Sequence, residues 1–212
     1  PYRTRQSRFT DHHLTNKKQN SRPSIHGKLI PQDPNDEPTI ELLKRINPDF
    51  TPCDNGHYTQ LPEGWAICKM KQITSITNGK SQKNVETLNG IYPIYGSGGV
   101  IGRANQNLWI AGSTIIGWKG TINNPIFVEE HFWIVDTAFG LKANDAILDK
   151  YLYYFCLSFD FSKLDKSTAM PSLTKTSIGN VLIPIPPYKE QERIVAKIDM
   201  VLDTMNEILR AV

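Results

Sequence analysis

The stretch that decides the fold lies near the C-terminus, at residues 183–212, and reads IPIPPYKEQERIVAKIDMVLDTMNEILRAV. Pro186 and Pro187 donate no backbone hydrogen bond, so the short apolar run before them ends there as a strand. From about Lys189 the sequence predicts one helix that continues to the end. A helix that leaves its domain through two prolines is expected to project from it.

One face of this helix carries apolar residues at heptad spacing, which is typical of a helix that pairs with another helix. An ordinary amphipathic helix packed on its own domain remains the alternative. The helix-pairing positions, called the heptad stripe below, are Ile194, Ile198, Val201, Met205 and Ile208.

The net charge of +3 is unevenly distributed along the chain. Residues 1–30 carry seven basic residues and one acidic residue, whereas residues 31–59 carry two and six. The remainder is nearly balanced, so an anion-binding surface there requires local clustering of cations. No apolar run approaches the roughly 18 residues that span a bilayer. Three widely spaced cysteines argue against a disulfide framework and a cysteine-based zinc site. We therefore expect a cytoplasmic protein without membrane association.

The chain divides into four parts by pattern. Residues 1–37 are polar and basic and predict a poorly ordered tail. Residues 38–60 predict a short helix, introduced by acidic residues and Pro38, and then a polar connection. Residues 61–187 predict a mixed, strand-rich α/β (α+β) domain, and residues 188–212 form the C-terminal coiled-coil-type helix.

Short β-like runs separated by Gly, Asn and Pro turns fill the main domain. One helix is expected there, at 149–157. The expected strands are 65–69, 91–95, 108–110, 113–118, 126–128, 132–135 and 181–185.

Three motifs resemble catalytic or cofactor-binding sequences, and each lacks a residue that the chemistry needs. The run 78–81 ends like a phosphate-binding loop but has Thr74 where a glycine is required. The run 96–102 places its third glycine one residue too late for a dinucleotide site, and no helix pattern follows it. The run 185–188 has Ile185 where an amino-methyltransferase needs a polar residue. The histidines lack metal-ligand spacing. We predict no catalytic site, no cofactor and no metal.

Four polar loops carry residues suited to nucleic acid. Loops one, two, three and four are residues 78–83, 95–103, 118–124 and 166–175. Glycines let backbone amides approach phosphates, and Lys, Arg, Ser and Thr supply phosphate and base contacts. The candidate DNA-binding residues are Lys80, Lys83, Tyr95, Ser97, Arg103, Lys119, Lys166, Ser172, Thr174 and Lys175.

Taken together, four stretches resemble the specificity subunit of type I restriction–modification systems. IHGKLIPQDPNDEP (25–38) is similar to the segment that leaves the central spacer helix of that family. LPEGW (61–65) resembles the start of a target-recognition domain, and YGSGG (95–99) with GWKG (117–120) resembles its core loops. IPIPPYKEQERIV (183–195) resembles the entry into the distal helix and is the most specific of the four.

The resemblance implies a subunit without catalysis of its own. Its recognition domain would read one half of a split double-stranded DNA target, and its long helices would pair as a spacer. The implied partners are the modification subunits, which methylate adenine, and through them the restriction subunit. Pairing with a second copy through the C-terminal helix stays open. A protein–protein adaptor without DNA readout is the alternative function.

Overall fold

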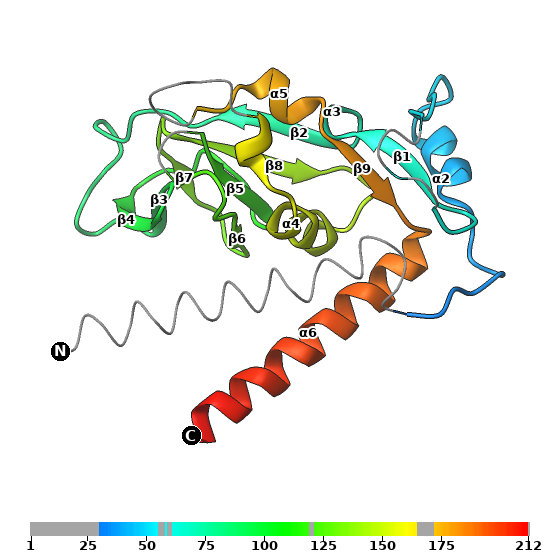
Figure 1. Ribbon diagram of the computed structural model, residues 1–212. Coiled ribbons are helices and arrows are strands. Elements are labelled where there is room, and N and C mark those ends of the chain that lie inside the picture. The colour runs from blue at the N-terminus through cyan, green and yellow to red at the C-terminus, as the bar shows by residue number, and fades with distance from the viewer. Residues whose placement is uncertain (1–29, 55–57, 59–60, 119–120, 165–171, 212) are drawn as a thin grey trace.

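Three small sheets and a long C-terminal helix organise the computed structural model, which describes residues 30–54, 58, 61–118, 121–164 and 172–211 (Figure 1). The largest sheet is antiparallel, with strand order β2-β8-β5-β6. Its inner strand β5 reads STIIG and is buried at all five positions, so it presents only small or apolar side chains to the neighbouring layers. The bounds are β2 Thr74–Asn78, β5 Ser113–Gly117, β6 Ile126–Val128 and β8 Ala138–Ala143.

A second sheet has the order β4-β3-β7 and lies at the left of Figure 1. Strands β3 (Tyr92–Gly96) and β4 (Gly99–Ala104) form a hairpin, and β7 (Trp133–Ile134) pairs parallel to β3. Gly99 has a φ of 127°, a conformation that L side chains rarely adopt. The glycine-rich run that resembles a dinucleotide loop is therefore a hairpin turn with an edge strand.

The third sheet joins the two ends of the domain. Strand β1 (Ala66–Lys69) pairs antiparallel with β9 (Leu182–Ile185), which leads directly into the C-terminal helix. Helix α2 (Thr39–Ile46) lies beside this pair, and Thr39 Oγ1 donates to the carbonyl oxygen of Ile185 at 2.9 Å. Leu43 of α2 belongs to the main core, so α2 packs on the same core as the strands.

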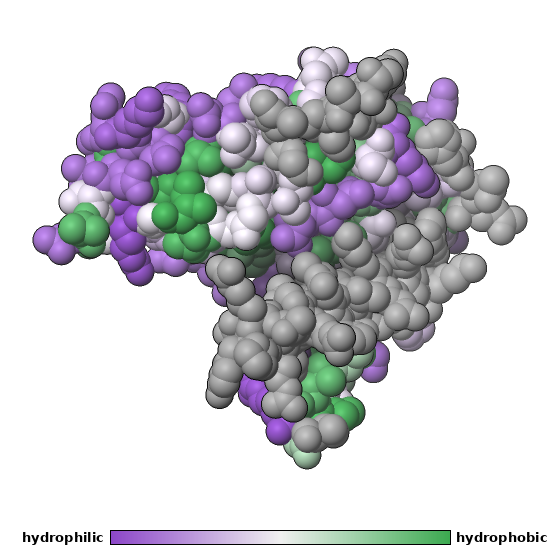
Figure 2. Space-filling model, turned by 60° about the vertical axis from the view of Figure 1, so that its left-hand side comes forward, coloured by the Kyte–Doolittle hydropathy of each residue, from purple (hydrophilic) through white to green (hydrophobic). Residues whose placement is uncertain are grey.

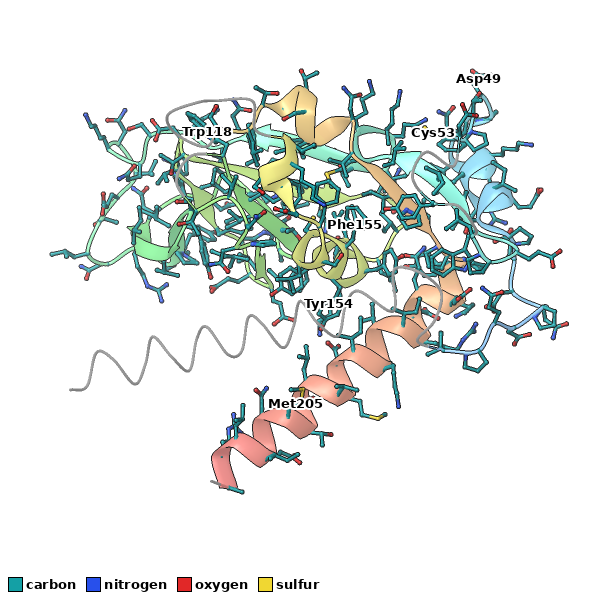
Figure 3. All side chains as sticks on the ribbon, in the orientation of Figure 1. Asp49, Cys53, Trp118, Tyr154, Phe155 and Met205 are labelled. Atoms are coloured by element: carbon teal, nitrogen blue, oxygen red, sulfur yellow. The ribbon has the colours of Figure 1, made fainter. Side chains whose placement is uncertain are left out.

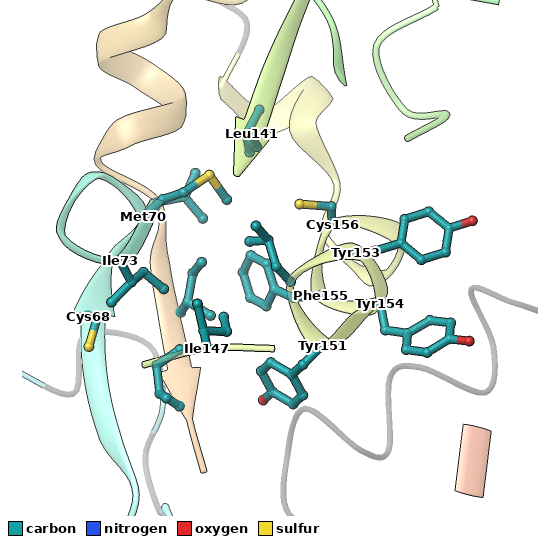
Figure 4. Packing of buried hydrophobic residues seen from close by; sticks show 14 of the residues in the cluster. Cys68, Met70, Ile73, Leu141, Ile147, Tyr151, Tyr153, Tyr154, Phe155 and Cys156 are labelled. Atoms are coloured by element: carbon teal, nitrogen blue, oxygen red, sulfur yellow. The ribbon is translucent and has the colours of Figure 1, made fainter. Parts of the chain in front are cut away.

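Helix α4 (Asp149–Ser158) forms the centre of the core. Residues 151–157 are all buried because the helix lies between the large sheet and the C-terminal helix. In Figure 4, Phe155 and Cys156 point toward Met70 and Leu141, whereas Tyr154 points the other way. Burial raises the pKa of the Cys156 thiol, so this cysteine is an inert packing residue. Short helical turns complete the domain: α3 Met70–Ile73, η1 Phe161–Leu164 and α5 Lys175–Gly179.

Helix α6 (Tyr188–Ala211) begins on the domain and then leaves it (Figure 1). Ile194, Ile198 and Leu202, spaced by four residues, are buried in the main core. Arg193, next to Ile194 in the first half of the helix, forms an ion pair with Asp36. Residues 30–37, part of the tail that the sequence predicts to be poorly ordered, therefore make defined contacts. Residues 1–29 lie outside the described residues.

The sequence locates most of the regular elements. The mixed fold with a long C-terminal helix, the short helix after Pro38, the helix near 149–157 and six of the seven expected strands are confirmed within a residue or two. The expected strand at 108–110 is wrong, because only an isolated bridge between Trp109 and Phe132 forms there. Sequence reasoning missed α3, α5, β2, β4 and β8.

Candidate nucleic-acid interface

Loop one leaves β2 against the turn that joins β7 to β8, residues 135–137, called the β7–β8 turn below. The backbone N–H of Lys80 donates to the Ile134 carbonyl at 2.9 Å, and Trp133 Nε1 donates to the Lys80 carbonyl at 2.9 Å. A β-carbon at Gly79 would lie 2.0 Å from a carbonyl oxygen of this turn, so only glycine fits there. The Lys80 backbone is thus held from both sides, while the side chains of Lys80 and Lys83 are exposed.

Loop two meets the same turn from the other sheet. The backbone N–H of Val135 donates to the Tyr95 carbonyl at 3.0 Å. A β-carbon at Gly117 would lie 2.7 Å from Cβ of Ser97, so loop two also rests against the end of β5. Arg103 lies exposed on the edge strand β4, where its Nη1 donates to a main-chain carbonyl 3.0 Å away.

Tyr95 is held by packing in a way that the sequence does not indicate. Its ring packs edge-on against Phe132, with centroids 5.6 Å apart and an interplanar angle of 81°. Burial, and secondarily the charge of Glu130, raises the pKa of the Tyr95 hydroxyl. The ring belongs to the small core under the hairpin.

Loops three and four join the cluster through Trp118, which Figure 3 places at the end of the domain far from α2. The Trp118 backbone N–H donates to the Thr137 carbonyl at 3.1 Å, and its indole N–H donates to the Asp136 carbonyl at 2.9 Å. The backbone N–H of Leu173 in turn donates to the Trp118 carbonyl at 2.9 Å. All four loops therefore converge on the β7–β8 turn, directly or through Trp118.

The remaining candidates lie around loop four. Ser172 and Lys175 are exposed. Thr174 is also exposed, but its Oγ1 accepts a hydrogen bond at 3.0 Å from a backbone N–H in the first turn of α5, so Thr174 caps that helix. Lys119 and Lys166 lie outside the described residues.

Two exposed residues near the cluster were not predicted from the sequence. Asp136 is exposed in the centre, on the β7–β8 turn itself. Lys71 of α3 lines a groove of about 570 Å³ together with Lys175 of α5. No local sequence pattern identifies either residue. Asp136 lies in a turn after a strand, and Lys71 lies in a helix of only four residues, which is too short to show a helical period.

The surface at this end is mixed in hydropathy. Figure 2 turns the left side of Figure 1 forward and shows hydrophilic areas together with residues of intermediate hydropathy and apolar patches. Exposed aliphatic residues of the hairpin sheet and the loop before it are Leu88, Ile91, Val100 and Ile101. Within the described residues, no cluster of His, Cys, Asp and Glu is able to hold a metal ion. In the same part of the chain, no helix combines the length and the apolar character needed to cross a membrane.

The heptad stripe divides into two halves. Ile194 and Ile198 are each 1% exposed and contact the domain's own core, as an ordinary amphipathic helix would. Val201 and Met205 are partly exposed, and Ile208 is 59% exposed. Figure 3 places Met205 on the part of α6 that extends beyond the domain. The prediction of helix pairing therefore depends on Val201, Met205 and Ile208 rather than on the first two positions.

The sequence of this domain also matches the model of a known protein family. The type I restriction modification DNA specificity domain matches residues 62–212. The chain belongs to this family, as its motifs predict. The matched domain confers specificity and not catalysis, which also agrees with the sequence.

Individual relatives agree with the family. The specificity subunit of the type I restriction enzyme EcoAI from Escherichia coli is 23% identical over an alignment of 240 residues, covering 87% of this chain and 39% of that protein. A chain from a structure of the type I R-M system, solved to explain complex assembly and conformational transition, superposes with a TM-score of 0.64 at 22% identity, covering 82% of this chain and 46% of that one. The HsdS subunit from Thermoanaerobacter tengcongensis gives 0.59 at 22% identity, covering 82% and 45%. The chain thus spans less than half the length of these relatives, and the structures share its fold.

Proposed function

We propose that this chain reads one half of a bipartite double-stranded DNA target as part of a type I restriction–modification complex. The observation that carries the proposal is the convergence of the four loops on the β7–β8 turn. Loops that are separated by up to about a hundred residues in the sequence meet at this turn, and their described residues include the exposed cations Lys80, Lys83, Arg103 and Lys175. A scaffold that brings several variable loops to one face is a common basis for recognition.

The charges on this surface suggest how DNA would lie on it. Lysine and arginine side chains contact phosphates, and arginine also binds guanine edges in the major groove. Asp136 in the centre repels phosphates, but its carboxylate is able to accept a hydrogen bond from the amino group of cytosine. The centre of the cluster would therefore face base edges, and the surrounding cations would hold the two backbones.

The partners follow from the family. Modification subunits would supply the methylation chemistry, and the restriction subunit would join through them. The distal half of α6 would pair with a second helix, either of the same subunit or of a second copy. Apolar side chains exposed on that half, Ile208 and Leu209 among them, provide a surface for such pairing.

Charge reversal on the loop surface tests the proposal. The triple variant Lys80→Glu, Lys83→Glu and Arg103→Glu should assemble normally with the modification subunits, because all three side chains are exposed. Its complex should bind duplex DNA much more weakly at low salt, because the lost cations no longer neutralise phosphates. The slope of log K against log salt should also become shallower by about 0.9 for each phosphate contact that is lost.

Lys44→Glu is the matched control, because Lys44 is exposed on α2 at the other end of the domain. This control should bind DNA like the unmodified chain. Unchanged DNA binding by the triple variant in an intact complex would refute the proposal and favour the adaptor function.

A further inference from the structure

Residues of β2, α3 and α5, three elements that lie side by side in Figure 1, line a polar groove. Its volume is about 570 Å³. Among the described residues that line it, two are lysines and none is acidic. Hydroxyl and amide side chains surround the two cations: the groove is lined by Lys71, Lys175, Thr74, Ser75, Thr77 and Asn180. We call it the two-lysine groove.

Packing of its stem fixes the position of Lys71. A β-carbon at Gly179 of α5 would lie 3.3 Å from Cβ and 3.8 Å from Cδ of Lys71, so the aliphatic part of the lysine runs along this glycine. The same point is 3.7 Å from Cδ1 of Ile76, which is buried beneath the groove. The stem is thus packed while the ammonium group remains at the surface.

Within the described residues, neither lysine forms an ion pair. Lys142 and Lys150 of the same domain form ion pairs with Asp149 and Asp199, at 2.6 and 2.9 Å. Among the ion pairs of the described residues, Lys71 and Lys175 take no part. Two exposed cations without carboxylate partners concentrate positive potential in the groove.

The groove continues the loop surface on two sides. Strand β2 runs from Thr74 to Asn78 and leads directly into Lys80 of loop one. Helix α5 begins at Lys175, immediately after the part of loop four that contacts Trp118. The five residues of β2, which lead from the groove into loop one, cover roughly 15 Å. The sugar–phosphate backbone of a duplex bound at the loops would therefore reach the groove.

We propose that the two-lysine groove binds the sugar–phosphate backbone of DNA beside the bases that the four loops read. Lysine ammonium groups bind phosphate as point charges, and Ser, Thr and Asn side chains are common phosphate ligands. The inference rests on the proposed function, because it assigns part of the same DNA-binding surface. It adds Lys71 to that surface and assigns Lys175, the last residue of loop four, to affinity rather than to base reading.

Neutralisation of the two lysines tests the groove. The variant Lys71→Gln/Lys175→Gln, in complex with the modification subunits, is titrated with a short duplex of arbitrary sequence over a series of salt concentrations. The slope of log K against log salt should become shallower by about 0.9 for each phosphate that the lysines neutralise in the unmodified complex. Binding should weaken by the same factor for every duplex, and the sequences selected from a random library should not change.

Lys44→Gln is the control, because it removes one exposed lysine far from the groove, and melting temperatures verify that all variants are folded. An unchanged salt slope in the double variant, with DNA binding intact, would overturn the groove assignment alone. A changed selected sequence would also overturn it, because the lysines would then read bases. Failure of the unmodified complex to bind any duplex would instead overturn the proposed function.

Discussion

Gln191 shows at the scale of one residue how the C-terminal helix is attached. Its side chain is fully buried, its Oε1 accepts from the Leu148 N–H at 2.8 Å, and its Nε2 donates to the carbonyls of Ala146 and Pro186 at 3.0 Å each. These bonds join the start of α6 to the chain that enters α4. The motif that resembles the family's helix entry thus contains a structural link between two helices.

Removal of this link should destabilise the domain. In Gln191→Leu, three backbone groups lose a buried partner, and each such loss costs about 1–3 kcal/mol. The free energy of unfolding, measured by denaturant titration, should fall by several kcal/mol. Glu192→Gln, an exposed change at the next position, is the control. A stability equal to that of the unmodified chain would show that these bonds do not hold the helix.

Glu190 gives a prediction on pH dependence. Its side chain is only 1% exposed, and Trp65 Nε1 donates to its Oε2 at 3.0 Å. Burial raises the pKa of the Glu190 carboxyl above its ordinary value of 4.5, while the indole hydrogen bond acts in the opposite direction. The folded state therefore binds the proton more tightly than the unfolded state. The stability that the group contributes is full below pH 4.5 and is lost as the pH rises through the raised pKa.

Glu190→Gln keeps an acceptor for the Trp65 indole and does not ionise. Its stability relative to the unmodified chain should therefore increase as the pH rises above 4.5, and it should be independent of pH below that value. Unfolding curves collected from acidic to neutral pH measure this difference. Glu207→Gln, exposed near the end of α6, controls for the loss of one negative charge. Parallel stability profiles for Glu190→Gln and the unmodified chain would contradict the prediction.

At the scale of elements, α6 has two roles along its length. Its first half completes the core through Ile194, Ile198 and Leu202, and its second half extends beyond the domain. Ile198→Ala should therefore destabilise the domain by about 2–5 kcal/mol. A disruptive change at Ile198 does not isolate helix pairing, because it also damages the core.

The double variant Met205→Asp/Ile208→Asp isolates pairing from folding. Two charges on the distal half of α6 should abolish association through this helix and leave the melting temperature of the domain nearly unchanged. Sedimentation of the protein and of its complex with the modification subunits measures the association. Thr204→Asp, at an exposed position outside the heptad stripe, should associate normally. Full association by the double variant would contradict the pairing role.

The elements that the sequence predicts are those that bury their side chains. Strand β5 is buried at every position and helix α4 is buried from 151 to 157, and their apolar runs identify both. Strands β2 and β4 lie at sheet edges, and most of their positions are exposed or only partly buried, so neither shows a clear strand pattern. Strand β8 contains Gly140, whose β-carbon would lie 2.6 Å from Cδ1 of Ile134; a strand glycine chosen for close packing weakens the sequence signal.

At the scale of the molecule, the sequence identifies the loops but does not indicate that they lie together in the fold. Lys80, Lys83 and Arg103 are recognisable from the sequence as candidate cations, yet the meeting of their loops depends on hydrogen bonds between distant segments at the β7–β8 turn. Lys71 and Lys175 line one groove although about a hundred residues separate them. Such juxtapositions follow from tertiary packing, which no local pattern reports.

Symmetry makes a prediction for a pair of these chains. Two copies joined through the distal half of α6 would present two identical loop surfaces related by a twofold axis. Such a pair reads an inverted repeat. Duplexes selected from a random library by the purified protein with its modification subunits should then contain two equivalent half-sites in opposite orientation. An asymmetric selected sequence would show that a different chain supplies the second recognition surface.

The β7–β8 turn bears on how the proposed DNA specificity of this chain could be altered by substitution. Most of the bonds that gather the four loops run between main-chain atoms, from Lys80 to Ile134, from Val135 to Tyr95 and from Trp118 to Thr137. Main-chain bonds tolerate replacement of most exposed side chains beside them. The exposed side chains of the proposed DNA-binding loops could therefore be replaced without loss of the hydrogen bonds that hold the loops together. A new DNA specificity would then require only substitutions of exposed side chains, and the fold of the domain would not change.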